Sequence, residues 1–206
     1  MERQKDGQVN SIKFTPAALL ALAAAALYAL NIPFSKFLLT SVPPAMLAAF
    51  LYLGAGVGMA LTRALGRRAH SSEPPLTRRE LPYVLVMIAL DIAAPILLMF
   101  GLRSTAAETA SLLGSFEIVA TAVVALAFFS EKVSRRLWAA ITLITLASLL
   151  LSLDGTSKLV FSPGALLVLA ACVCWGFENN CTRKLSSKSA AEIVTVKGLF
   201  SGAGSL

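Results

Sequence analysis

The chain of 206 residues holds six separate stretches that are each long and apolar enough to cross a lipid bilayer, and the start of a seventh. A helix needs about 20 mostly apolar residues to span the hydrocarbon core. Of all residues, 57% are hydrophobic and 14% are charged, whereas a soluble domain has about a quarter charged residues. The sequence therefore predicts an all-α polytopic membrane protein. The predicted spans are residues 17–39, 44–65, 81–102, 106–130, 137–153 and 163–185, followed by the partial span 191–206.

The formal net charge of +7 follows the predicted topology. Lys and Arg gather in the N-terminal tail, residues 1–16, and in alternate connections at 66–80, 131–136 and 183–188. Short loops rich in these residues stay in the cytoplasm. We therefore predict a multi-pass protein of the cell (inner) membrane with a cytoplasmic N-terminus. A nucleic-acid surface would gather basic and aromatic side chains on one soluble face, and the sequence shows no such cluster. We therefore predict that the protein contacts the lipid bilayer and does not bind nucleic acid.

Motifs for cofactor or metal chemistry are missing from the sequence. It has no G-x-x-x-x-G-K-[ST] phosphate loop, and Cys172, Cys174 and Cys181 have a spacing that fits no zinc site. We predict no cofactor, no metal site and no enzymatic activity. Gly54 and Gly58, four residues apart in the second span, predict a face on which two helices approach closely.

A shift of 147 residues aligns the first span with the sixth. Ala- and Leu-rich runs match, and the same register continues through an aromatic, a polar, a hydroxyl and a basic position. Because one copy holds five spans, an odd number, the second copy must enter the membrane from the opposite side. Such inverted repeats are a common plan of secondary transporters. The aligned pairs are Tyr28 with Trp175, Asn31 with Glu178, Ser35 with Thr182, and Lys36 with Arg183.

Four charged residues fall in the middle of predicted spans: Asp91, Glu117, Glu178 and Lys197. Each costs about 2.5–3.5 kcal/mol at the centre of a membrane helix, so such residues mark functional sites by default. We predict that they face a substrate path. The alternative, static ion pairs that hold helices together, is left open.

The first span adds a milder polar group. Asn31 lies two residues before Pro33, and proline removes a backbone hydrogen bond, which breaks a helix. Broken helices line the binding sites of many transporters. Tyr28 and Trp175 share helix faces with Asn31 and Glu178 respectively. The predicted substrate-binding residues are Tyr28, Asn31, Asp91, Glu117, Trp175, Glu178 and Lys197.

These features resemble the EamA-type drug/metabolite transporters. The run 25–31 followed by Lys36 is similar to the aromatic-small-x-Asn signature of that family, and Glu117 and Glu131 resemble its paired carboxylates. The resemblance implies ten helices in two five-helix inverted repeats. We accordingly expect a complete first repeat at 17–153 and a partial second repeat at 163–206. The chain is then expected to be truncated after about six and a half helices.

The predicted function is that of a secondary transporter that exports small metabolites or amphipathic compounds by alternating access. A small molecule is the predicted substrate, and a proton or ion gradient is the expected energy source because no ATP motif is present. Homodimer formation, the direction of transport and the identity of the substrate stay open. One alternative is a non-transporting membrane scaffold. A remote alternative is a seven-helix retinal photoreceptor using Lys197 and Asp91, which the internal repeat disfavours.

Overall fold

In the computed structural model the described residues are 16–65, 74–131, 134–153 and 162–206, with the backbone alone at 17 and 147–153. Every regular element in these ranges is a helix, which confirms the all-α prediction. The contacts divide the chain into two units, Met1–Asn31 and Ile32–Leu206. The helices are α1 (Pro16–Ala29), α2 (Asn31–Leu38), α3 (Pro44–Leu65), α4 (Leu81–Ser104), α5 (Ala107–Gly114), α6 (Phe116–Phe128), α7 (Arg135–Leu153), α8 (Pro163–Lys184), α9 (Ala190–Val196), the π-helical η1 (Lys197–Ser201) and α10 (Gly202–Gly204).

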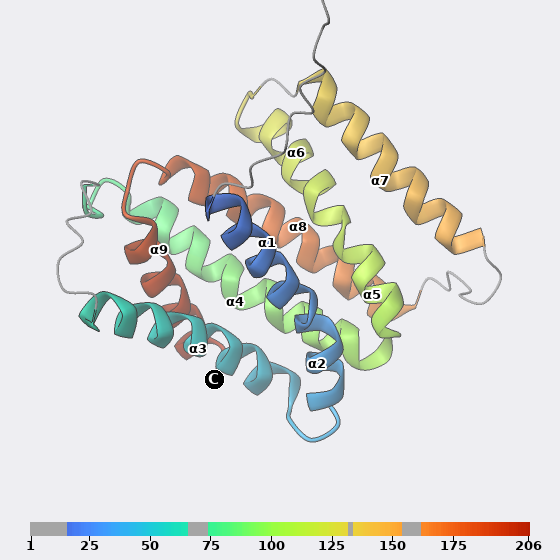
Figure 1. Cartoon of the computed structure of the whole chain (residues 1–206), viewed down its shortest axis with the longest axis horizontal. Helices are drawn as coiled ribbons and strands as arrows, with labels where there is room; N and C mark the ends of the chain where they lie inside the picture. The colour runs from blue at the N-terminus through green and yellow to red at the C-terminus, as the bar shows by residue number, and fades with distance from the viewer. Residues whose placement is uncertain (1–15, 66–73, 132–133, 154–161) are drawn as a thin grey trace, which may run out of the picture. The chain divides into compact units, whose positions relative to one another are not determined.

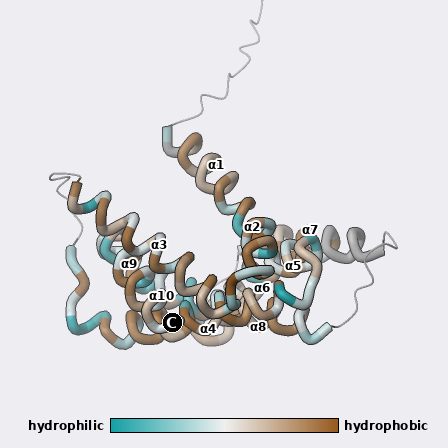
Figure 2. The backbone as a smooth tube through the Cα atoms, turned by 90° about the horizontal axis from the view of Figure 1, so that it is seen from below, coloured by the Kyte–Doolittle hydropathy of each residue, from teal (hydrophilic) through white to brown (hydrophobic). Residues whose placement is uncertain are grey.

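Five helical segments among the described residues are long and apolar enough to cross a membrane. They agree with five of the predicted spans, and the fifth predicted span, 137–153, corresponds to α7. Figure 2 shows that hydrophobic residues follow the helices while the described connection before α4 is hydrophilic. The segments are Ala18–Leu38, Pro44–Leu65, Leu81–Ser104, Ala107–Phe128 and Pro163–Lys184.

Within the larger unit, α8 packs against α4 along most of its length and against α6 on another side (Figure 1). The helix α3 packs against α9 and η1. A buried apolar cluster joins α4, α5 and α8 and includes Leu98, Leu102, Leu113 and Val168. The helix α8 is therefore the central element on which both polar sites described below are built.

Two of the predicted spans contain breaks. The first span turns at Leu30, immediately before Asn31, as the proline in this segment leads one to expect. The fourth span, predicted over 106–130, is present as the segment Ala107–Phe128, and within it the helix divides at Ser115 into α5 and α6. Gly and Ser are weak helix formers, and Gly114 with Ser115 forms a tighter turn in which the Ser115 amide donates to the carbonyl of Leu112.

The partial seventh span is helical from Ala190 to Gly204, with a π-helical turn at its centre. This turn, η1, begins at Lys197, and its backbone coil is wider than that of an α-helix. It lies where α3 comes closest to this span. A Cβ atom built on Gly56 would lie 2.5 Å from the amide nitrogen of Leu199. The close approach predicted for Gly54 and Gly58 is not found within the described part of the chain, where a Cβ on either of them would meet nothing within 4 Å. The contact belongs to Gly56 on the opposite face.

Three connections that were predicted to share the cytoplasmic side lie at one end of these helices. The ammonium group of Lys188 lies 3.3 Å from the carboxylate of Glu80, and Arg183 pairs with Glu131. The backbone amide of Leu76 also donates to Glu192 at 3.3 Å. These contacts agree with the prediction that the three connections lie on the same side. Residues 1–15, 66–73, 132–133 and 154–161, which include parts of the predicted loops, lie outside the described part of the chain.

Candidate functional site

A cluster of three charged side chains lies among α4, α8 and η1. The Lys197 Nζ atom lies 2.7 Å from Glu178 Oε1 and 3.2 Å from Asp91 Oδ2. Asp91 is 0% exposed and Glu178 is 2% exposed. Removing charges from water costs several kcal/mol per ion unless they are paired, so one ammonium group serves two enclosed carboxylates here. The formal charge of the three groups, when all are ionised, is −1.

Hydrogen bonds extend the charged cluster to α3. The hydroxyl of Tyr52 donates to Asp91 Oδ1 at 2.9 Å, and the indole Nε1 of Trp175 donates to the Tyr52 hydroxyl at 3.3 Å. On the other side, the hydroxyl of Thr182 donates to Glu178 Oε1. Four helical elements thus contribute to one continuous polar chain, which we call the buried cluster: Tyr52, Asp91, Trp175, Glu178, Thr182 and Lys197.

The local backbone explains how the buried cluster is positioned. Asp91 stands near the middle of α4, and Glu178 stands one helical turn before Thr182 on α8. Lys197 is the first residue of the π-helical turn, a feature that often occurs at functional sites. The backbone contact between Gly56 and the residues after Lys197 holds this turn against α3.

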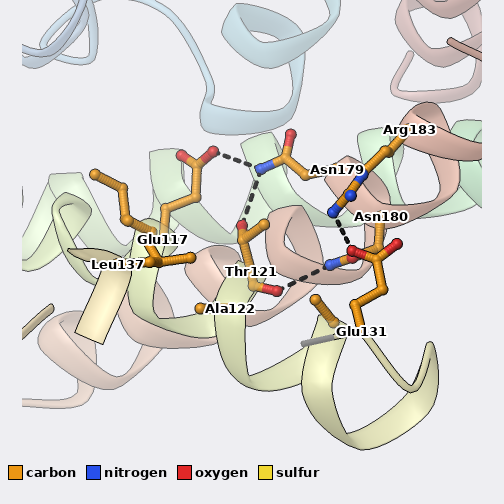
Figure 3. Close-up of a pocket in the computed structure, with 10 residues that line it drawn as sticks. Glu117, Thr121, Ala122, Glu131, Leu137, Asn179, Asn180 and Arg183 are labelled. Carbon is orange, nitrogen blue, oxygen red and sulfur yellow. Dashed lines mark hydrogen bonds and ion pairs between the residues drawn. The ribbon is translucent and has the colours of Figure 1, made fainter. Parts of the chain in front are cut away.

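A second polar site is a cavity of about 300 Å³ beside α6 and α8, with Leu137 of α7 on its wall (Figure 3). Glu117 Oε1 accepts a hydrogen bond from Asn179 Nδ2 at 2.9 Å. The same amide nitrogen donates to Thr121 Oγ1 at 3.2 Å. At the other end of the cavity Arg183 pairs with Glu131. The lining residues are Glu117, Ile118, Thr121, Ala122, Ala125, Glu131, Leu137, Asn179, Asn180 and Arg183.

The structure brings four predicted site residues together and keeps a fifth apart. Asp91, Trp175, Glu178 and Lys197 belong to the buried cluster. Glu117 lines the cavity, whose lining includes none of those four residues, so the expected single pocket is two sites. Tyr28 and Asn31 belong to the N-terminal unit, Met1–Asn31, and their place in a substrate pocket stays a prediction.

Sequence reasoning missed Tyr52 and Asn179. Tyr52 lies in the second span, and a hydroxyl near the middle of a span is itself a costly group that could have indicated it. Asn179 follows Glu178 directly, and adjacent residues on a helix point about 100° apart, since a turn takes 3.6 residues. Its polarity in the middle of a polar stretch could have indicated a second polar face of α8.

Helices that cross a membrane with paired charges enclosed between them define a polytopic membrane protein with a polar interior, the architecture of transporters. The model of the EamA-like transporter family matches residues 15–153. The chain belongs to this family, and it is a multi-pass membrane protein of a transporter family. The expectation from sequence is confirmed at this level.

An uncharacterized transporter from Methanothermobacter thermautotrophicus (strain Delta H) is 24% identical to the chain over 197 residues. The match covers 89% of this chain and 57% of the relative. The chain thus spans a little more than half the length of this relative. No solved structure matches the chain. The division of the chain into two inverted repeats stays a prediction.

Proposed function

We propose that the chain forms part or all of a secondary transporter that exports small metabolites or amphipathic compounds, with the buried cluster as its substrate-binding site. The observation that carries the proposal is the enclosure of Asp91 and Glu178 around one ammonium group, that of Lys197. A membrane helix gains nothing by holding such charges unless they serve binding or assembly. The sequence places them at the depth where transporters bind their substrates.

The chemistry of the buried cluster suits exchange of ionic partners. A polar group of the substrate competes with Lys197 for a carboxylate, or with a carboxylate for Lys197, while the Tyr52 hydroxyl and the Trp175 indole offer further hydrogen bonds. The same carboxylates supply groups that can take up a proton or an ion, which would couple transport to a gradient. Alternating access would then separate and re-form the contacts of α4, α8 and η1.

The orientation proposed for this transporter puts the N-terminus in the cytoplasm and the chain in the inner membrane. Its support is the distribution of Lys and Arg, together with the contacts that join three of the basic connections at one end. A non-transporting scaffold is the competing function, favoured by the fact that ion pairs also hold helices together.

A cell-based efflux assay separates the two functions. Cells that express the full chain are compared with empty-vector cells for resistance to, and release of, a panel of amphipathic toxic compounds and radiolabelled metabolites. We expect Asp91→Asn and Glu178→Gln to lower the release of any exported compound at least about tenfold, since each removes an ionic partner. Glu108→Gln, a carboxylate in the first turn of α5 outside both sites, is the matched control.

The purified variants are checked by thermal unfolding so that loss of fold is not mistaken for loss of transport. Release that is unchanged in folded Asp91→Asn and Glu178→Gln proteins would contradict a substrate site in the buried cluster. Reduced stability with no release of any compound above the empty-vector control would favour the scaffold.

A further inference from the structure

The cavity beside α6 and α8 holds a carboxylate that has no ionic partner among the residues that the structure describes. Glu117 lies near the middle of the segment Ala107–Phe128, which is apolar enough to cross the membrane. Its carboxylate accepts a hydrogen bond from the neutral amide of Asn179 at 2.9 Å. A carboxylate at this depth is costly, and a hydrogen bond from a neutral amide balances its charge only in part.

The other charges of the cavity balance each other. Arg183 and Glu131 form an ion pair at the end of α8. Among the described residues of the lining, the titratable groups are Glu117, Glu131 and Arg183, and their formal charge of −1 belongs to Glu117. A bound cation would give Glu117 the kind of ionic partner that Lys197 gives Asp91 and Glu178.

The remaining walls define the rest of the ligand. Ile118, Ala122, Ala125 and Leu137 give the cavity an apolar side. Thr121 and Asn179, joined at 3.2 Å, stand beside Glu117 and position its carboxylate. The volume of about 300 Å³ is at the lower end of the range for small-molecule pockets. Figure 3 shows the carboxylate group of Glu117 and the side chain of Leu137 on the same side of the cavity.

We propose that this cavity is a second binding site, separate from the buried cluster, for a small amphipathic organic cation. Its ammonium group pairs with Glu117, and its apolar body contacts Ile118, Ala122, Ala125 and Leu137. The inference does not depend on the proposed function, because the described residues that line the cavity with Glu117 include none of the six residues of the buried cluster. The ammonium group can come from a free amine or from the headgroup of a membrane lipid.

The test is equilibrium binding of radiolabelled benzyltrimethylammonium to the purified full chain in nanodiscs of phosphatidylglycerol. We expect saturable binding that unlabelled benzyltrimethylammonium displaces and that neutral benzyl alcohol and anionic phenylacetate do not. Glu117→Gln keeps the size of the side chain and an acceptor for Asn179, and it should raise Kd at least about tenfold. Glu108→Gln removes the same charge outside the cavity and should leave Kd unchanged.

Two further measurements keep the result interpretable. Ala125→Phe fills the cavity while retaining Glu117, so it should also abolish binding; thermal unfolding without ligand identifies any variant that fails to fold. In nanodiscs of phosphatidylcholine, the quaternary ammonium headgroup of the lipid can compete with the probe for the site and would then raise the apparent Kd of the probe above its value in phosphatidylglycerol. Glu117→Gln would remove this difference between the two lipids. Equal Kd values in the two lipids indicate a free amine as the ligand.

The proposal is overturned if folded Glu117→Gln protein binds the probe as the unchanged chain does. It is also overturned if benzyl alcohol or phenylacetate displaces the probe equally well, because charge would then play no part. Asp91→Asn separates this result from that of the proposed function: it should lower efflux through the buried cluster and leave binding of the probe at Glu117 intact.

Discussion

Gly56 of α3 and Gly198 of η1 meet backbone to backbone, with no room for a side chain on either residue. The contact lies next to Lys197, whose ammonium group joins Asp91 and Glu178. Close helix packing and the buried cluster are therefore parts of one arrangement. The packing of α3 sets where the charge of Lys197 is held.

Substitution of Gly56 by Ala should destabilise the protein. A Cβ at this position would lie 2.5 Å from the amide nitrogen of Leu199, and overpacking of this kind costs about 1–3 kcal/mol. Thermal unfolding in detergent measures the change. The matched control is Gly54→Ala, whose Cβ meets nothing within 4 Å and which should be neutral or slightly stabilising. Equal effects of both variants would contradict the packing described here.

Replacing Lys197 by Met should destabilise the protein more strongly. The change leaves Asp91 and Glu178 enclosed without their shared cation, and breaking a buried ion pair costs about 3–5 kcal/mol. Adding Asp91→Asn in the double variant removes one of the two stranded carboxylates and should restore part of the loss. Unfolding by a denaturing detergent gives the comparison; a double variant as unstable as the sum of the two single variants would argue against the cluster.

Lys36 should stabilise the end of α4. Its Nζ atom donates to the carbonyl oxygens of Leu102 at 2.6 Å and of Thr105 at 2.8 Å. A hydrogen bond from a charged group contributes about 1.5–3 kcal/mol to the stability of a folded protein. Lys36→Met should therefore speed hydrogen exchange of the amides at the end of α4. Arg103→Met removes the same charge from the same helix end and should have little effect, since among the described residues only the backbone carbonyl of Arg103, and not its side chain, contacts Lys36.

The contact between Glu80 and Thr77 should depend on pH. The Thr77 hydroxyl and amide donate to Glu80 Oε2, the amide at 2.7 Å, and these bonds, with Lys188 adding to them, lower the pKa of Glu80 from 4.5 to about 2. Because the folded pKa lies below the unfolded one, the stabilisation is present above pH 4.5 and is lost as the pH falls toward 2. Protection of the Thr77 amide against hydrogen exchange should fall in this window.

Glu80→Gln is the control for this pH dependence, because it removes the titrating group. Exchange of the Thr77 amide in this variant, corrected for the intrinsic rate, should no longer change between pH 5 and pH 2. A transition that survives in the variant would assign the pH dependence to another group.

The predicted topology can be tested with single cysteines at positions 72 and 157, after Cys172, Cys174 and Cys181 are replaced by Ala or Ser. A membrane-impermeant thiol reagent added outside should label Ser157→Cys and should miss Ser72→Cys, because the connection 66–80 carries the basic residues that stay in the cytoplasm. Permeabilised membranes supply the positive control for both positions. The opposite pattern would reverse the orientation.

Most of the helical architecture could be predicted because the amino-acid composition of a long continuous segment decides whether it spans the membrane. A run of about 20 apolar residues has few alternatives in a bilayer, so α3, α4 and α8 begin where the sequence predicts. The break at Ser115 was missed because it depends on tertiary contacts as well as on weak helix formers. The Cys172 thiol lies 3.5 Å from the carbonyl oxygen of Leu113 at this break, a contact that no local pattern could indicate.

Which residues form the site together could be predicted only in part, because tertiary packing decides it. The cost of charge in a span marks Asp91, Glu178 and Lys197 individually, but their pairing depends on how η1 meets α3. Glu117 carries the same signal and yet lies in a different cavity, because the face of α8 that it meets presents Asn179 and not Glu178.

Glu178 and Asn179 are consecutive residues of α8, and they serve two different compartments. Glu178 belongs to the buried cluster, and Asn179 holds Glu117 in the cavity. A rigid helix cannot turn one of these side chains while leaving its neighbour in place. Rotation of α8 about its own axis would therefore move a wall of the cavity and a carboxylate of the buried cluster in the same step.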